Sequence, residues 1–248
     1  VELGPTLRKL VTAARFNPSL PYLSFLCINF DAPVIKEAAS WFLDGVFLNY
    51  NSSYLEQMLE QLLDEDDSPE ITRFLRAVDV RIDGFRVEKA PEWRGQRVFV
   101  KHEVDGKGYE LRLSEESAGT QKLMGLAAYL MTALERGGTV VVDELDAKLH
   151  PKLLRYVILL FKDPEVNKSG AQLIFSSQDV STMRNDVFRR DEIWFAARGE
   201  GEASQLWSLA DIHEANGNLV SKNAAFDKQY LSGRYGADPY LTRIEEWD

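Results

Sequence analysis

The feature that most constrains the fold is a short apolar stretch that ends in two acidic residues. Residues 139–142 read Thr-Val-Val-Val, and Asp143 and Glu144 follow directly. A β-branched run without polar alternation is typical of a strand buried on both faces of a parallel sheet. In open α/β sheets, ligands bind outside the carboxyl ends of such strands. The sequence therefore predicts an α/β fold with a candidate site at Asp143 and Glu144.

The two neighbouring carboxylates suit two different tasks. Asp143 could hold Mg²⁺, which prefers hard oxygen ligands and needs few protein groups. Glu144 could polarise a water molecule for attack on a γ-phosphate. A strand followed by an ordinary acidic turn has the same pattern, and this motif alone does not separate the two interpretations.

A second candidate lies at the start of the helix that we expect over residues 120–135. Ser117 is a good N-cap, and Gly119 would let the backbone approach a ligand closely. Free N–H groups and the helix dipole make such a helix start suitable for binding an anion. An ordinary capped helix remains the alternative, because Glu115 and Glu116 already complement the dipole.

Two further polar segments follow strand-like runs. Gln178 lies in the segment 175–179, after the apolar run that starts at Leu173. A polar side chain there could reach a γ-phosphate, or the segment could be a plain turn between a strand and a helix. Asp146 and His150 follow the acidic pair, and Pro151 suits a helix start. For His150, a catalytic role and a capping role both stay open.

The rest of the chain alternates helix-like and strand-like segments. We expect residues 1–79 to be a helical segment, with helices over 33–48, 52–63 and 70–77, whereas 23–30 fits a buried strand or a buried helix equally well. Residues 80–248 are expected to form an α/β lobe. Its strands are expected at 80–87, 97–102, 109–113, 139–142, 173–176, 191–196 and 205–209, and its helices at 120–135 and 151–162. This order predicts a parallel core sheet with antiparallel edge strands.

Composition excludes several classes of protein. The net charge is −10, from 29 basic and 39 acidic residues, so bulk charge does not support binding to nucleic acid. Cys27 is the single cysteine and cannot form a disulfide within the chain. No apolar stretch reaches the roughly 20 residues that span a bilayer, and no secretory pattern opens the sequence. We therefore expect a cytoplasmic protein without a membrane anchor.

The order and spacing of these motifs resemble the ATP-binding-cassette ATPase superfamily, in its non-transporter branch with the structural-maintenance-of-chromosomes, Rad50 and RecF proteins. Within that branch, the chain is similar to the prokaryotic ATPases of the AAA15 or abortive-infection type. The resemblance implies the fold of a P-loop NTPase. It is carried by the segments 116–122, 142–146 with 149–151, 171–175, 189–195 and 230–237.

The resemblance also implies roles for individual residues. Asp143 would be the Walker B aspartate that holds Mg²⁺, and Glu144 would be the general base. Ser117 and Gly119 would belong to the signature motif, which contacts the γ-phosphate of ATP held by a partner subunit. Asp146 would lie in the D-loop at the dimer interface. The cofactors would be ATP and Mg²⁺, bound by a head-to-tail homo-oligomer.

The chain departs from the family pattern at two points. Gln178 stands where the superfamily usually has a switch histidine, so Gln178 could support turnover poorly. The sequence also contains no Gly-x-x-x-x-Gly-Lys-Ser/Thr segment, the loop that cradles phosphates (Walker A). We expect that the 248 residues are the C-terminal portion of a longer ATPase whose loop lies upstream.

Three functions remain open at this stage. The first is an ATPase that drives a separate effector protein, which the resemblance places in anti-phage defence. The second is a DNA-repair ATPase of the SMC or RecF kind, although neither heptads nor a basic face support it. The third is an interaction module that senses ATP with weak catalysis. The segment 233–237, with Arg234 and Tyr235, either meets an anion or ties down the C-terminal part of the chain.

Overall fold

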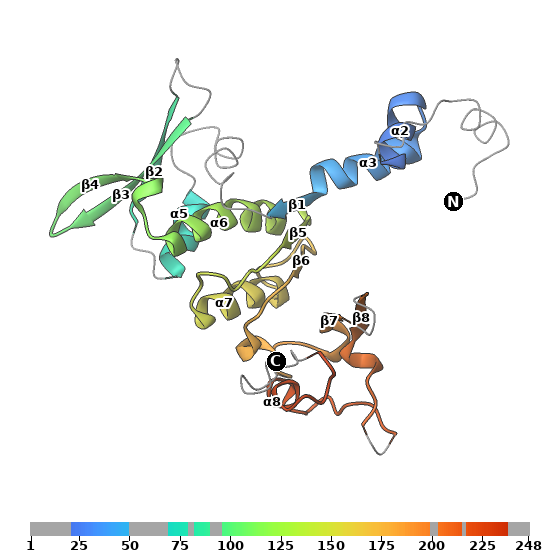
Figure 1. Cartoon of the computed structure of the whole chain (residues 1–248). Coiled ribbons are helices and arrows are strands. Elements are labelled where there is room, and N and C mark those ends of the chain that lie inside the picture. The colour runs from blue at the N-terminus through green and yellow to red at the C-terminus, as the bar shows by residue number, and fades with distance from the viewer. Residues whose placement is uncertain are drawn as a thin grey trace, which may run out of the picture. The chain divides into compact units, whose positions relative to one another are not determined.

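A computed structural model of the chain describes residues 21–49, 69–78, 82–89, 96–198, 203–214 and 217–237 (Figure 1). The helix expected over residues 52–63 lies outside these ranges. The chain divides into two compact units. The first contains Val1–Asp143 and Leu160–Phe175, and the second contains Glu144–Leu159 and Ser176–Asp248. None of the described helices has the length and apolar character that crossing a bilayer requires.

The first unit contains a parallel sheet of three strands in the order β1-β5-β6. These strands are β1 (Val46–Asn49), β5 (Thr139–Val142) and β6 (Gln172–Phe175). Val142 lies opposite Phe175 in the register of β5 and β6. Val140 is fully buried and Val142 nearly so, as expected for the central strand of a parallel sheet. This confirms the α/β fold with a parallel core.

Strand β1 corrects the expectation of a helix over residues 33–48. Helix α3 (Pro33–Gly45) ends at Gly45, and Val46 starts a strand that pairs with Thr139. A Cβ atom added to Gly138 would lie 2.8 Å from Cε2 of Phe47, so β1 packs closely on the start of β5. The helical spacing of the apolar residues did not reveal this pairing, because the two strands are far apart in sequence.

Helix α2 (Tyr22–Asn29) resolves the open alternative for residues 23–30 in favour of a helix. Phe25 and Leu26 of α2 pack with Ile35 of α3 in a small apolar cluster. Cys27 is partly buried, and its thiol lies 3.5 Å from the carbonyl oxygen of Ile35.

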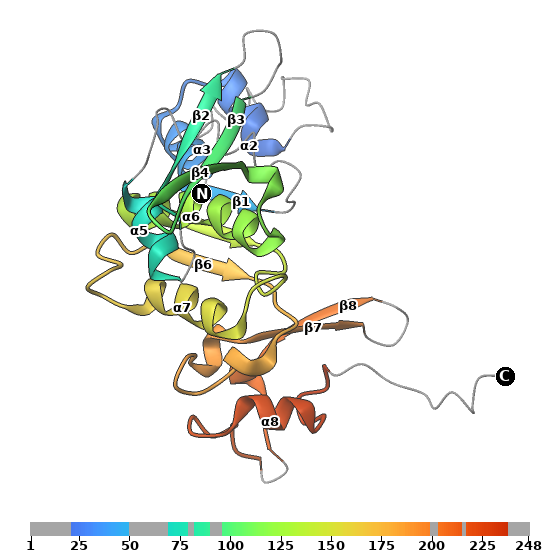
Figure 2. The ribbon, with the colours of Figure 1, turned by 90° about the vertical axis from the view of Figure 1, so that its left-hand side faces the viewer.

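The longest helix, α6 (Ala118–Arg136), supplies much of the core of the first unit. Its buried face includes Leu123, Leu126 and Leu130, and helix α5 (Pro69–Ala77) packs beside it (Figures 1 and 2). The helix ends at Gly137, which has a φ of 80°. A Cβ atom at Gly137 would lie 2.4 Å from the carbonyl oxygen of Ser169, so this turn between α6 and β5 requires glycine.

The first unit also contains an antiparallel sheet in the order β2-β3-β4. Its strands are β2 (Gly84–Lys89), β3 (Gln96–Val104) and β4 (Lys107–Arg112). Asp105 and Gly106 join β3 to β4 with φ values of 51° and 74°, which confirms the predicted tight turn. The 3₁₀ turn η2 (Leu113–Glu115) then leads into α6, and Leu113 is almost completely buried.

The second unit contains the hairpin of β7 (Trp194–Arg198) and β8 (Ser204–Ser208), which are antiparallel as predicted (Figure 2). In the described residues, the antiparallel strands form sheets of their own and do not extend the parallel sheet. Helix α7 (Pro151–Lys162), whose residues up to Leu159 belong to this unit, precedes the hairpin in the chain, and helix α8 (Phe226–Leu231) follows it. Three short 3₁₀ turns lie between these elements. They are η3 (Val180–Thr182), η4 (Arg190–Glu192) and η5 (Leu209–Asp211).

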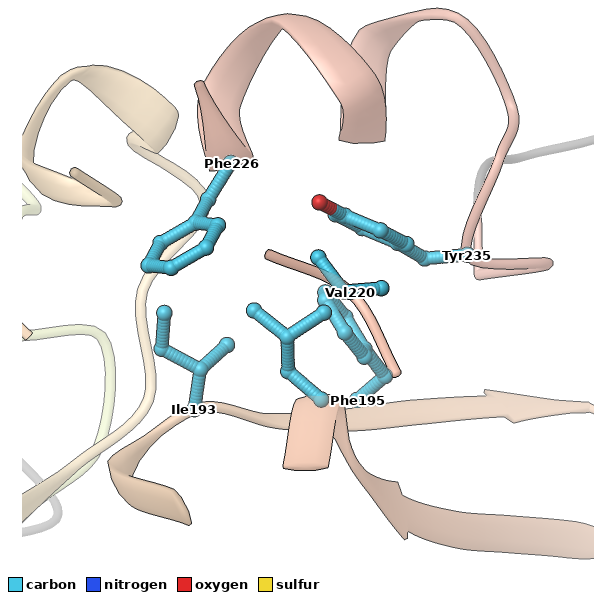
Figure 3. Close-up of a cluster of buried hydrophobic side chains, with 6 residues drawn as sticks. Ile193, Phe195, Val220, Phe226 and Tyr235 are labelled. Carbon is cyan, nitrogen blue, oxygen red and sulfur yellow. The ribbon is translucent and has the colours of Figure 1, made fainter. Parts of the chain in front are cut away.

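The hairpin and α8 enclose an apolar cluster, here called the C-terminal core cluster (Figure 3). Its members are Ile193, Phe195, Leu209, Val220, Phe226 and Tyr235. The Tyr235 hydroxyl donates to Oε1 of Gln229 over 2.7 Å. The indole N–H of Trp207 donates to the Tyr235 carbonyl over 3.2 Å. For the 233–237 segment, Tyr235 therefore supports the tie-down interpretation, whereas Arg234 is exposed.

Candidate functional site

The candidate site is built where β5 and β6 end. Because Val142 is the register partner of Phe175, Asp143 and Ser176 each follow their strand at the same edge of the parallel sheet. Asp143 is exposed. This is the edge at which ligands bind in open α/β sheets, as the sequence predicted.

Residues 144–149, here called the acidic turn, follow Asp143 and have an unusual backbone. Glu144 has a φ of 49° and Lys148 a φ of 64°, the left-handed region that residues with a Cβ atom rarely adopt. Ser176, which follows β6, accepts two hydrogen bonds from the main chain of this turn. The Glu144 N–H donates to Oγ of Ser176 over 2.8 Å, and the Leu145 N–H donates to its carbonyl over 3.0 Å. Leu145 is fully buried and anchors the turn.

Asp146 connects the acidic turn to the segment after β6. Its Oδ2 accepts the N–H of Gln178 over 3.2 Å, so the structure brings together Asp146 and Gln178, two of the predicted site residues. Oδ1 of Asp146 is buried and has no hydrogen-bond partner among the described residues. A buried acceptor without a partner costs about 1–3 kcal/mol, and such groups in native proteins need an explanation.

The segment after β6 folds as a tight polar turn. Oγ of Ser177 accepts the N–H of Asp179 over 3.0 Å, and the Asp179 carboxylate accepts the N–H of Ser181 over 2.7 Å. These bonds fix the main chain on both sides of Gln178, whose side chain is exposed. The amide of Gln178 is therefore presented to solvent from an ordered turn.

His150 lies at the start of α7 and caps it. Its carbonyl accepts the N–H groups of Leu153 and Leu154 over 2.8 and 3.1 Å. Its Nδ1 accepts the N–H of Lys152 over 3.2 Å. Of the two roles left open for His150, this geometry supports the capping role.

Ser117 and Gly119 lie in the first unit, at the start of α6. Oγ of Ser117 accepts the N–H of Thr120 over 3.1 Å, which confirms Ser117 as the N-cap. Oγ of Ser117 also lies 2.9 Å from Oγ1 of Thr120. Ser117 is exposed and Gly119 is half-buried. This is the capped helix that the sequence offered as the alternative, and the binding of an anion at this helix start stays a prediction.

Sequence reasoning missed one pair beside this helix start. Nε2 of His102 on β3 lies 2.6 Å from Oε1 of Glu116, the residue before Ser117. The two residues are separated by fourteen positions in sequence and belong to different elements. No motif or periodicity signals such a contact.

The donors available for a metal are few. The described residues contain no group of three or more His, Cys, Asp or Glu side chains that could hold a metal ion. Mg²⁺ is usually bound by one or two carboxylates together with phosphate oxygens and water. The exposed carboxylates that follow β5 fit this kind of site, in which a nucleotide supplies part of the coordination shell.

Comparison with known proteins identifies the family. The model of the family described as "AAA domain, putative AbiEii toxin, Type IV TA system" matches residues 17–184. The chain belongs to this family. The six predicted site residues of this AAA domain, from Ser117 to Gln178, lie inside the matched range, whereas the C-terminal core cluster lies beyond it.

Solved structures resemble this AAA domain more remotely. One comes from work on the "structural biochemistry of ATP-driven dimerization and DNA stimulated activation of SMC ATPases". It has a TM-score of 0.41 and 14% identity, and the match covers 75% of this chain and 99% of that chain. Another is the SmcHead bound to the C-winged helix domain of ScpA, with a TM-score of 0.36 and 15% identity, covering 71% of this chain and 47% of that chain. A search of curated proteins finds no match.

Proposed function

We propose that this AAA domain binds ATP with Mg²⁺ and hydrolyses it. The observation that carries the proposal is the acidic turn, which Ser176 holds in a left-handed conformation at the carboxyl edge of the parallel sheet. Such a backbone costs roughly 1–3 kcal/mol for each strained residue and is concentrated at functional sites. Membership of the AAA family supports a nucleotide as the ligand at this edge.

Within this proposal, the residues after β5 and β6 perform the chemistry. Asp143 would hold Mg²⁺, which would offset the negative charge of the phosphates. Glu144 acts as the general base that orients and deprotonates the attacking water. Gln178 donates from its amide to the γ-phosphate, because its main chain is fixed and its side chain is exposed.

The remaining predicted residues act between two copies of the chain. We propose a head-to-tail dimer in which Ser117 and Gly119 of one copy meet the γ-phosphate held by the other. A hydroxyl and a helix start suit an anion. Asp146 lies at the dimer interface in this arrangement, where its Oδ1, which has no partner among the described residues, gains a donor.

A partner is also part of the proposal. ATP turnover drives a separate effector protein, and the family description, which names a putative toxin of a type IV toxin–antitoxin system, is compatible with a role in anti-phage defence. The chain's charge of −10 gives no support to an alternative role as a DNA-repair ATPase.

A second candidate is a module that binds ATP as a signal and turns it over slowly. Gln178 favours this function, because an uncharged amide stabilises the transition-state charge less well than a histidine can. The two candidates share the binding site and differ in the rate of turnover.

Glu144→Gln in the full-length protein tests the proposal. Loss of the base lowers ATP turnover about 100-fold or more, while ATP-dependent dimerisation, measured by light scattering, is retained or strengthened. Glu165→Gln, which changes an exposed acid in the loop after α7, serves as the control and leaves both unchanged. A wild type that neither binds nor hydrolyses ATP would contradict the proposal, and binding with very slow turnover would select the second candidate.

A further inference from the structure

The residue before the Ser117 cap is held at three of its polar atoms. Oε1 of Glu116 lies 2.6 Å from Nε2 of His102 on β3. The Glu116 carbonyl accepts from Nε2 of Gln121 over 2.7 Å, and the Glu116 N–H donates to the Leu113 carbonyl over 3.2 Å. Side chain, carbonyl and amide of Glu116 are thus fixed by a strand, a helix and a 3₁₀ turn.

Burial makes the pairing with His102 important. The Glu116 side chain is 10% exposed and the His102 side chain 21% exposed, so neither group can rely on water alone. Burying a carboxylate to this extent is costly unless it is hydrogen-bonded. Removing one partner of such a pair destabilises a protein more than replacing both partners by apolar residues. The 2.6 Å separation is slightly shorter than the roughly 2.7–2.9 Å that is usual for a charge-assisted N–H···O bond.

The direction of the Glu116 carboxylate matters for an anion at the start of α6. A carboxylate next to a helix start can turn toward the free N–H groups, where it would occupy the place of a phosphate and repel it. His102 instead holds this carboxylate toward β3 and offers its own donor to the negative charge. The N–H groups of the first turn of α6 are then not occupied by this carboxylate, although the Thr120 N–H is already bonded to Oγ of Ser117.

We infer that His102 is a positioning residue, which acts through Glu116 to set the place and charge of the Ser117 segment. Its effect on ATP rests on the proposed function, in which this segment meets the γ-phosphate held by a second copy. The contact of His102 with Glu116, here called the clamp, lies in the first unit alone, because His102, Glu116 and Ser117 all belong to that unit. It can therefore be tested separately from ATP.

The first measurement is amide hydrogen exchange at the start of α6 without nucleotide, in the full-length protein. His102→Leu keeps most of the side-chain volume but removes the donor, and it raises the exchange rate of the Thr120 and Gln121 amides, which bond to Ser117, about tenfold. His102→Gln places an amide N–H near the position of Nε2 and restores the slow exchange. Glu103→Ala, an exposed neighbour on β3, is the control. Unchanged exchange in His102→Leu would overturn the clamp.

The second measurement is the ATP concentration for half-maximal dimerisation. We expect His102→Leu to raise it about tenfold, as the loss of one charge-assisted hydrogen bond would, and His102→Gln to stay within about twofold of wild type. In a Ser117→Ala background, His102→Leu has no further effect, because both act through one segment. Additive effects would contradict positioning through Ser117.

The two measurements distinguish a failure of the positioning role of His102 from a failure of the proposed function. If His102→Leu loosens the helix start but leaves ATP-dependent dimerisation unchanged, the clamp exists and the positioning role is wrong. If the wild type shows no response to ATP, the proposed function is wrong and the positioning role falls with it, while hydrogen exchange still decides the clamp. If His102→Leu does not fold, Glu116→Gln, which removes the charge but keeps the shape, is measured instead.

Discussion

The acidic turn and the C-terminal core cluster lie in the same unit but differ in how far their polar groups are hydrogen-bonded. In the core cluster, the hydroxyl of the buried Tyr235 donates to Gln229, and the main-chain carbonyl of Tyr235 accepts from the Trp207 indole. In the acidic turn, Oδ1 of Asp146 is buried without a partner among the described residues, and Glu144 has a positive φ. Buried side chains with satisfied polar groups, as in the core cluster, stabilise the unit. A positive φ and a buried oxygen without a partner among the described residues, as in the turn, do not contribute to stability.

This difference indicates where the unit serves function. Strained and incompletely satisfied groups persist when the surroundings over-determine them, and they are concentrated at sites that bind or react. Ser176 and the buried Leu145 provide that support for the turn. The comparison therefore predicts that substitutions in the core cluster change stability, while substitutions in the turn change activity with little loss of stability.

The largest effect on stability is expected for Phe226→Ala. Phe226, at the start of α8, is 1% exposed and belongs to the core cluster (Figure 3), so its truncation leaves a cavity. We expect the free energy of unfolding to fall by about 3–5 kcal/mol. Leu231→Ala on the same helix, where Leu231 is 70% exposed, should change it by less than about 0.5 kcal/mol. Denaturant unfolding checks both, and equal effects would contradict the assignment of the core.

A smaller effect on the free energy of unfolding is expected at alkaline pH, where the ionisation of Tyr235 contributes. Burial raises the pKa of Tyr235 to about 12 from the ordinary value of 10. Above pH 10 the unfolded chain loses this proton and the folded chain keeps it, so stability is full below pH 10 and falls as the pH rises toward 12. The loss is on the order of 2 kcal/mol across this interval.

Tyr235→Phe provides the comparison for this pH dependence. The variant lacks the hydroxyl, so it loses about 1 kcal/mol at neutral pH with the bond to Gln229. Its stability should then decline less steeply than that of the wild type between pH 10 and 12, in denaturant unfolding at each pH. Identical slopes would show that Tyr235 ionises freely and is less enclosed than the structure has it.

Local patterns predicted the elements whose causes are local. The Ser117 cap, the Asp105-Gly106 turn and the strand before Asp143 follow from residue types within a few positions of one another. Pairing between distant segments was not readable in this way. Val46 and Phe47 continue a helical apolar pattern, and only the register with β5 makes them a strand.

The candidate site shows the same limit. The order of motifs placed Asp146 and Gln178 on loops at one sheet edge, and the structure joins them by a hydrogen bond. The positive φ of Glu144 and its bond to Ser176 depend on three-dimensional packing that no spacing rule encodes. The same holds for the buried Oδ1 of Asp146, which has no partner in the part of the chain that the structure describes. The His102–Glu116 pair is hidden for the same reason, because only the approach of β3 to the start of α6 creates it.

The smallest effect on stability, and the sharpest test of the comparison, is expected for Asp146→Asn. The amide oxygen can still accept the Gln178 N–H, and a neutral group replaces a partly buried carboxylate whose buried Oδ1 has no partner among the described residues. We therefore expect the free energy of unfolding to stay within about 0.5 kcal/mol of wild type or to rise slightly.

The same substitution should nevertheless reduce ATP turnover about tenfold or more, because the proposed dimer interface loses a charged acceptor. Asp146→Ala serves as the contrast, since it also removes the bond to Gln178 and should cost about 1 kcal/mol of stability. Thermal unfolding and ATP turnover, measured on the same samples, decide between the outcomes. A clear destabilisation of the Asn variant with normal turnover would mean that the Asp146 carboxylate stabilises the fold, and the contrast between the turn and the core cluster would then fail at Asp146.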